Sequence, residues 1–308
     1  MGRIRSWWGG LGKWRRIGII ALLSFGLVVL GRLLFPVSMP HFELAAEVLW
    51  SPFGIPITNT MIAAWLTILV IGGISYAATR KMRLVPHGLQ NVMEASVEML
   101  MNFVESIAGK EYGRKFFPVV ATIFIFVIAN AWLALLPGFM SIGFWHTEGE
   151  EQVLIPLFRG ANTDINVPLA LALVSFIFVE YWGFRSHGFI RYMSRFVNVR
   201  QYFGGVGQML RGRVRSGMSM LFSGIIDIFV GFIEMVSEMV RIMSFTFRLF
   251  GNMTAGEILI FSMMFLIPWV AAIPFYGLEL FIGFVQALIF CGLTVVFLVM
   301  AVTPHEEH

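Results

Sequence analysis

Long apolar runs dominate the chain, and short polar segments separate them. A helix that crosses a membrane needs about 20 consecutive, mainly apolar residues. Stretches of this length cover residues 17–36, 57–79, 116–136, 165–184, 217–267 and 275–302. The pattern therefore predicts an all-α polytopic membrane protein.

The first apolar stretch follows five basic residues and is open to two interpretations. It is either a retained membrane anchor or a cleaved signal peptide. Its length exceeds the roughly 7–15 apolar residues of a signal peptide, and no A-x-A cleavage site follows. We therefore favour an anchor or signal-like helix within residues 1–40, followed by a membrane domain at 41–308.

Residues 88–108 show a different periodicity. Apolar side chains recur at helical spacing along this segment, whereas Glu94, Glu98 and Glu105 lie off the apolar stripe. Amphipathic helices of this kind lie on the membrane surface. The segment is therefore predicted to be a helix that does not span the membrane.

The stretch at 217–267 contains no proline and reads as one helix. At about 1.5 Å per residue it is more than twice as long as the hydrocarbon core, which is about 30 Å thick. The helix must therefore be strongly inclined, or it must bend, with Gly251 and Gly256 as candidate hinges.

A turn bracketed by Pro268 and Pro274 follows this long helix. The final apolar helix at 275–302 then returns across the membrane. Residues 217–302 are therefore predicted to form a long, steeply inclined two-helix hairpin at the C-terminus.

The composition supports the membrane assignment. Apolar residues make up 58% of the 308 residues, charged residues only 13%, and the mean hydropathy is +0.81. A water-soluble enzyme could not bury so much apolar surface, and a disordered chain would be far more polar. The single cysteine, Cys291, excludes a disulfide framework and a thiolate metal site. His305 and His308 fit a solvated tail, so no metal and no cofactor is expected.

The basic residues predict an orientation. The N-terminal segment and residues 80–115 and 185–216 hold five, six and seven Lys or Arg, whereas 37–56 and 138–163 hold none and one. Because cytoplasmic segments carry the excess of Lys and Arg, both termini are predicted to be cytoplasmic. Nucleic-acid binding is not expected. The loop at 185–216 is either an ordinary cytoplasmic loop or a dock for a protein stalk or anionic lipid.

A polar stripe runs along the long predicted helix. At about 100° per residue its members fall within an arc of about 80°. They are Asp227, Glu234, Glu238, Arg241, Arg248 and Asn252. An ionisable side chain at membrane depth costs about 2.5–3.5 kcal/mol, so these groups should face protein or water. Two members have plainer interpretations, since Arg241 could simply neutralise Glu238 and Asp227 could be solvated near the membrane face.

Arg248 is the most informative member, because a guanidinium does not deprotonate at accessible pH. Glu257 lies nine residues further on, on another face, where it could meet the final helix. That helix carries Glu279 and Gln286, seven residues apart on one face. An antiparallel hairpin would bring Glu257 and Glu279 to comparable depth. Two buried carboxylates cannot both ionise cheaply, and such a pair suits a proton path.

Three segments resemble one known family. FRLFGNMTAGE at 247–257 closely resembles the signature of subunit a of F-type ATP synthases. FVQALIF at 284–290 resembles the last helix of that family, and TDINVPLALAL at 163–173 is similar to the start of its fourth span. The resemblance covers about 41–308 and leaves the N-terminal anchor as an addition.

The resemblance implies a function. In this family subunit a is the stationary partner of a ring of c subunits, is held by peripheral-stalk b subunits, and provides two proton half-channels without performing bond chemistry itself. Arg248 matches the essential arginine between the half-channels. Asn252, Glu257, Glu279 and Gln286 match channel-lining positions, Glu234 a position on the cytoplasmic path, and Asn130 a polar position on the third span. The expected location is the bacterial inner membrane rather than a thylakoid or another energy-coupling membrane.

The sequence departs from the family pattern at Glu257 and Glu279, at Leu133, and in the basic loop 185–216, which is longer than usual. Many relatives hold one carboxylate and one histidine where this chain has Glu257 and Glu279, and some hold an aspartate where it has Leu133.

Two other functions remain as alternatives. A secondary ion transporter would show repeats or broken helix pairs, which the sequence lacks, and a scaffold would not conduct. The titratable pair favours protons over sodium as the coupling ion.

Overall fold

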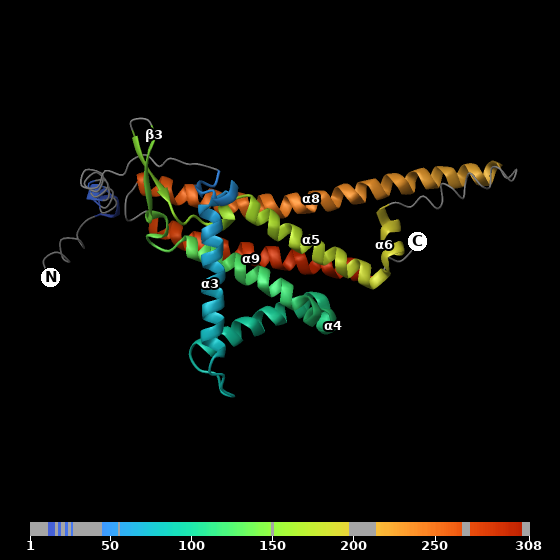
Figure 1. Ribbon diagram of the computed structural model, residues 1–308, viewed down its shortest axis with the longest axis horizontal. Coiled ribbons are helices and arrows are strands. Elements are labelled where there is room, and N and C mark those ends of the chain that lie inside the picture. Colours follow the sequence, from blue (N-terminus) through green and yellow to red (C-terminus); the bar gives the residue numbers. More distant parts are fainter. Residues whose placement is uncertain are drawn as a thin grey trace. The chain divides into compact units, whose positions relative to one another are not determined.

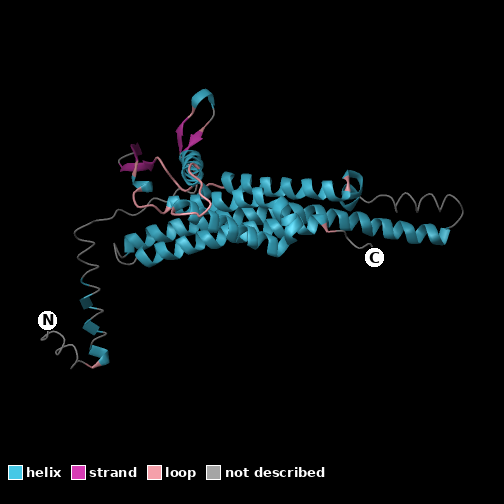
Figure 2. Cartoon of the chain, turned by 90° about the horizontal axis from the view of Figure 1, so that it is seen from below, coloured by secondary structure: helices cyan, strands magenta, loops and turns pink. Residues whose placement is uncertain are grey.

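The computed structural model describes residues 12–15, 18–19, 22–23, 26, 45–54, 56–148, 151–196, 214–266 and 272–303. Its contacts divide the chain into two compact units. One unit consists of Met1–Leu44 and Thr254–Phe281, and the other consists of Ala45–Met253 and Ile282–His308. Helices form most of the described chain, and the strands are confined to two small hairpins (Figure 2).

Five helices of the described chain are long and apolar enough to cross a membrane (Figure 1). They are α3 (Asn59–Thr79), α4 (Leu89–Ala134), α5 (Asn166–His187), α8 (Val214–Leu266) and α9 (Ala272–Val302). The prediction of an all-α polytopic membrane protein is confirmed, and the chain is a multi-pass integral membrane protein.

A short antiparallel pair precedes the first of these helices. Strand β1 (Val48–Trp50) pairs with β2 (Ile57–Thr58), and the 3₁₀ turn η1 (Pro52–Gly54) connects them. The Thr58 hydroxyl then accepts a hydrogen bond of 3.3 Å from the backbone N–H of Met61. This N-cap satisfies one of the free N–H groups at the start of α3.

Helix α4 contains both the predicted surface helix and the predicted third span. Gly109 joins the two halves with φ 72° and ψ 167°, a conformation that strains any residue with a Cβ atom. The halves approach closely beyond this kink, because a Cβ atom at Gly113 would lie 3.0 Å from Cγ of Glu105. Residues 110–115, which lay between the two predicted helices, therefore continue the helix.

The connection from α4 to α5 contains a hairpin. The turn η2 (Phe139–Ser141) leads into β3 (Gly143–Glu148) and β4 (Glu151–Pro156), which pair antiparallel with Gly143 opposite Pro156. The acidic segment between the third and fourth predicted spans lies largely within these strands. A second turn, η3 (Ala161–Thr163), then delivers the chain to α5.

A short helix, α6 (Phe189–Phe196), follows α5 after Gly188, whose φ is 80°. The Tyr192 ring packs against Gly183, where a Cβ atom would overlap it. The remainder of the basic loop, 197–213, lies outside the described residues, as do 27–44, 267–271 and the tail with His305 and His308.

The core of the second unit gathers residues of α4, α5, α8 and α9. Its fully buried members include Phe116, Val127, Leu249, Val295 and Leu298. The hydroxyls of Ser175 and Thr294 are 2.9 Å apart within this core, so a hydrogen bond joins α5 to α9. A Cβ atom at Gly283 on α9 would lie 2.9 Å from the Ala131 methyl on α4, so these helices also approach closely.

Helix α8 is continuous, and neither Gly251 nor Gly256 interrupts it. Helix α9 begins at Ala272, three residues before the predicted start. Pro274 therefore lies in the first turn of α9, where a missing N–H removes no intrahelical hydrogen bond.

Candidate functional site

Arg248 lies on α8 at the boundary between packed and open surface. Its neighbours Phe245 and Leu249 are buried, whereas Phe247 and Asn252 are exposed and Arg248 itself is half-buried. Its Nη2 donates a hydrogen bond of 3.3 Å to the Ser244 hydroxyl, and its Cζ lies 5.9 Å from the centroid of the Phe245 ring. Within the described residues no carboxylate pairs with this cation.

Arg241 has a different environment, two turns before Arg248. Its Nη1 and Nη2 each lie 2.7 Å from an oxygen of Glu238, which is buried, and its Cζ lies 3.8 Å from the centroid of the Phe297 ring on α9. Bidentate pairing and stacking on a ring are the contacts that a planar guanidinium favours. Arg241 thus neutralises Glu238, which is one of the two interpretations that the sequence left open.

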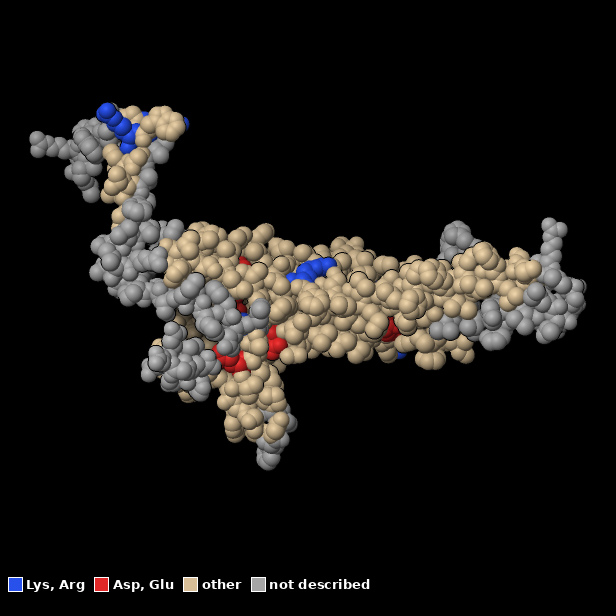
Figure 3. Space-filling model, turned by 90° about the horizontal axis from the view of Figure 1, so that it is seen from above, with Lys and Arg blue, Asp and Glu red and all other residues tan. Residues whose placement is uncertain are grey.

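The other members of the polar stripe vary in burial. Asp227 and Glu234 are half-buried, and Asn252 is exposed. Only 11% of the most apolar stretch of α8 is buried within the described chain. The visible surface along the long helices is mostly uncharged (Figure 3). The stripe therefore follows the edge of an open apolar helix surface, which lipid or another membrane subunit must cover.

Glu279 occupies a tight position in the other unit. Its side chain is buried, and its carboxylate lies directly against Gly256 of α8, where a Cβ atom would overlap it. Gly256 immediately precedes Glu257, which is half-buried. The final helix therefore contacts α8 at the residue before Glu257, and Gly256, which makes room for the carboxylate, was not among the predicted site residues.

Gln286 is buried on α9, one turn after Gly283. Glu279 and Gln286 both lie at buried positions of this helix. Their seven-residue spacing had predicted a shared face of the helix.

Asn130 lies in a buried polar cluster on α4. Its Oδ1 accepts a hydrogen bond of 3.2 Å from the backbone N–H of Ala161, and its Nδ2 donates one of 3.4 Å to Oδ1 of Asn162. Asn162 in turn donates a 3.4 Å hydrogen bond to the Val127 carbonyl. These contacts fasten the η3 turn to α4.

Asp164 extends the same cluster to two other helices. Its carboxylate accepts a 2.9 Å hydrogen bond from the Thr60 hydroxyl on α3 and a 3.1 Å hydrogen bond from the backbone N–H of Asn166 at the start of α5. The TDINV run carries a family resemblance, but neither Asp164 nor Asn162 was among the predicted site residues. The signal that could have identified them is the presence of polar side chains directly beside an apolar run.

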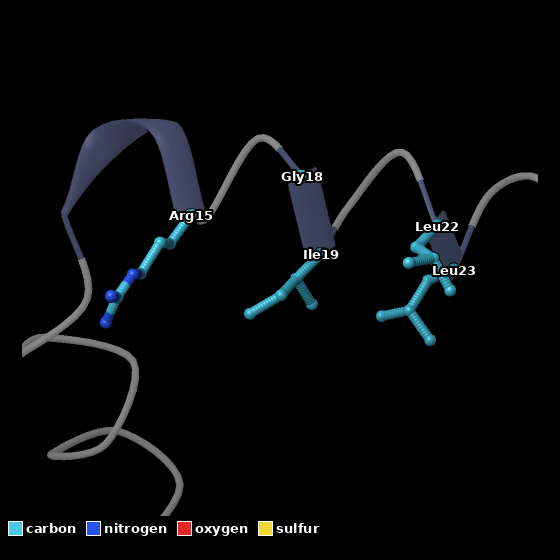
Figure 4. Close-up of a pocket in the computed structure, with 5 residues that line it drawn as sticks. All are labelled: Arg15, Gly18, Ile19, Leu22 and Leu23. Carbon is cyan, nitrogen blue, oxygen red and sulfur yellow. The ribbon is translucent and has the colours of Figure 1, made fainter.

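Other features of the described residues give no second site. No group of three or more His, Cys, Asp or Glu among them could hold a metal ion. One hollow is lined by Arg15, Gly18, Ile19, Leu22 and Leu23 (Figure 4). These residues recur at spacings of three and one, which is the periodicity of one helix face, and Leu22 and Leu23 are exposed, so the hollow is an open surface rather than an enclosed site.

Comparison with known proteins identifies the family. The family described as ATP synthase A chain matches residues 61–299, which is most of the chain. The chain belongs to this family. The match covers α3 from its third residue onward and all the candidate site residues from Asn130 to Gln286, whereas the N-terminal segment precedes it.

Curated relatives agree with this membership. ATP synthase subunit a of a Nitratiruptor species is 31% identical over 251 residues, which cover 82% of this chain and 91% of that protein. ATP synthase subunit a of Campylobacter fetus subsp. fetus is 31% identical over 244 residues, covering 79% and 89%. That of Helicobacter pylori is 30% identical over 243 residues, covering 79% and 89%.

Proposed function

We propose that this chain is the stationary, proton-conducting subunit in the membrane sector of a rotary ATP synthase. Its family membership and the name of its relatives support the assignment to that complex. The observation that carries the mechanism is the setting of Arg248, a half-buried cation on an open helix surface without a carboxylate partner in the described chain.

Arg248 acts on a carboxylate that another subunit supplies. A permanent positive charge in an apolar setting attracts a deprotonated carboxylate and repels a free proton. The ring of c subunits presents one such carboxylate after another as it turns. Arg248 therefore draws each carboxylate into its deprotonated form and prevents protons from passing directly between the two half-channels.

The polar residues on either side of Arg248 supply the two routes. Asn252, Glu257, Glu279 and Gln286 line the half-channels, with Glu257 and Glu279 assigned to the outer one, and Glu234 lies on the cytoplasmic one. Glu238 and Arg241 neutralise each other in our structure, which supports Arg248 as the working cation of the stripe. The contacts of Asn130 favour a structural role. In this proposal Asp227 lies at the cytoplasmic end of the stripe.

The same proposal includes the partners of the chain, its membrane and its division into domains. Its partners are the ring of c subunits, peripheral-stalk b subunits, the rest of the synthase and membrane lipid. The chain lies in a bacterial inner membrane with both termini cytoplasmic, as the distribution of Lys and Arg supports. Residues 1–40 form an added anchor and 41–308 the conducting domain. The chain performs no catalysis on its own and acts only as part of the complex. Protons are the coupling ion.

The variant Arg248→Ala tests the proposal. In inverted membrane vesicles that hold the assembled complex, we expect loss of ATP-driven proton pumping. Arg114→Ala is the matched control, because Arg114 is an exposed cation on α4 that pairs with Glu105. Pumping at the native rate in Arg248→Ala, with the complex assembled, would reject the proposal, and a scaffold without conduction predicts that outcome.

A further inference from the structure

The loop between α3 and α4 combines exposed apolar side chains with unpaired cations. Leu84 is completely exposed, with a relative exposure of 105%, and Met82 and Val85 are each 66% exposed. Arg80, Lys81 and Arg83 are also exposed, and none of them forms an ion pair within the described chain. Exposed apolar side chains of this kind mark a surface that binds a membrane or a protein.

Gln90 holds this loop in place. Its side chain is buried, accepts a 3.1 Å hydrogen bond from the backbone N–H of Arg83, and donates one of 3.0 Å to the carbonyl of the same residue. Its Nε2 also lies 2.7 Å from a carboxylate oxygen of Glu94. The amide thus clamps the loop at Arg83, between the exposed Met82 and Leu84, so these apolar side chains are presented from an ordered backbone.

The first half of α4 continues the exposed apolar surface. Leu89, Val92 and Met99 are 44%, 59% and 54% exposed, and at about 100° per residue they share an arc of about 80°. The acidic residues Glu94, Glu98 and Glu105 lie on the opposite side of the helix by the same geometry. The apolar side of this helix therefore carries no negative charge, and its acidic side is free to face water.

The length of α3 sets the depth of the loop. Its 21 residues extend for about 31 Å, which matches the hydrocarbon core of about 30 Å. If α3 crosses the membrane, the chain leaves it at Thr79, at the level of the lipid headgroups. Residues 80–93 carry three cations and no acid, so their charge is complementary to anionic headgroups.

We propose that the loop at 80–88, together with the exposed apolar side of α4 at Leu89, Val92 and Met99, docks on an anionic phospholipid surface. Met82, Leu84 and Val85 insert between the headgroups, and Arg80, Lys81 and Arg83 bind lipid phosphates. Each cation near an anionic surface favours the docked loop by about fivefold, and the three together by about a hundredfold. This docking anchors the start of α4 beside the span that follows Gly109.

A nitroxide spin label at position 84 tests the docking in the full chain. The variant Leu84→Cys is labelled and reconstituted in vesicles of phosphatidylcholine with or without phosphatidylglycerol. The native Cys291 is fully buried, so the labelled wild-type chain measures the background. Collision with oxygen, which concentrates in lipid, is compared with collision with a nickel chelate, which stays in water. We expect the oxygen-to-nickel ratio to rise several-fold when phosphatidylglycerol is present.

Two sets of substitutions assign the effect to the loop cations. Arg80→Gln, Lys81→Gln and Arg83→Gln together should abolish the response to phosphatidylglycerol. Lys110→Gln, Arg114→Gln and Lys115→Gln remove the same number of cations from the same inter-span segment and should preserve it. Two of these control cations already pair with Glu105 and Glu111. A loss in both sets would show an effect of total charge and overturn the proposal.

Two further results would contradict the docking. The label could collide with the nickel chelate equally in both kinds of vesicle, which would place the loop in water. The label could instead become shielded only when the other synthase subunits are added, whatever the lipid, which would identify a protein partner. The readout does not involve proton pumping, so it is independent of the proposed function.

Discussion

The carboxylate of Glu279 on α9 lies directly against Gly256 on α8, and a Cβ atom at position 256 would overlap it. The glycine thus makes room for a buried acidic group from the next helix. Because Gly256 immediately precedes Glu257, the contact brings Glu279 to the same level of α8 as Glu257, within one unit. A substitution at position 256 should therefore act through the position of Glu279.

We expect Gly256→Ala to displace the Glu279 carboxylate and to slow proton conduction through the membrane sector several-fold. The measurement is passive proton flow through vesicles stripped of the soluble ATPase sector. Gly277→Ala is a suitable control, because a Cβ atom at this helical position of the same unit meets no atom within 4 Å. Equal conduction by the two variants would mean that the position of Glu279 does not limit proton flow.

Removing either acidic group should also slow proton flow. Glu257→Gln and Glu279→Gln keep the size of the side chain but cannot release a proton, so each should reduce ATP-driven pumping in inverted vesicles. Glu98→Gln, at an exposed acidic position of α4, should pump at the native rate. Native rates in both channel variants would show that the outer half-channel is wrongly assigned.

The pair of Glu238 and Arg241 makes a prediction about stability. Glu238→Gln leaves a guanidinium without its partner in a largely buried place, and breaking a buried ion pair costs about 3–5 kcal/mol. The double variant Glu238→Gln with Arg241→Gln removes both charges and should be more stable than the single variant. Thermal unfolding of the purified chain in detergent gives the order of stabilities. A double variant less stable than Glu238→Gln would contradict mutual neutralisation.

Asn130 should prove structural. Asn130→Ala leaves the Ala161 N–H without its acceptor, and an unsatisfied buried group costs about 1–3 kcal/mol. We expect lower thermal stability, while the pumping rate per assembled complex stays near the native value. A pumping loss without loss of stability would instead assign Asn130 to the proton path.

Hydrophobic length and periodicity predicted most of the helices. The expected spans at 57–79 and 165–184 correspond to α3 and α5, because each is an apolar run of bilayer length bounded by polar residues. The charged residues Lys110, Glu111, Arg114 and Lys115 suggested a break before the third span. They continue α4 instead, since the direction of the chain changes at Gly109 alone. Helix α6 and the β3–β4 hairpin went unpredicted, because short elements give weak periodic signals.

The candidate site could be predicted in its members but not in its contacts. The spacing of the stripe placed Glu238 and Arg241 one turn apart, which is enough to predict their pairing. Nothing in the sequence indicated that Phe297, more than fifty residues later, would cover the guanidinium, since this contact depends on how α9 packs against α8. The same holds for Gly256, whose importance comes from Glu279 on another helix.

The unbroken length of α8 limits how much its polar side chains can differ in depth along the membrane normal. Its 53 residues measure about 80 Å, so a straight helix confined to a hydrocarbon layer about 30 Å thick gains only about 2 Å of depth per turn. Glu234 and Asn252 are 18 residues apart in the chain, yet they would then differ in depth by only about 10 Å. Residues spread over five turns of a helix inclined in this way would be separated mainly sideways in the membrane plane rather than in depth.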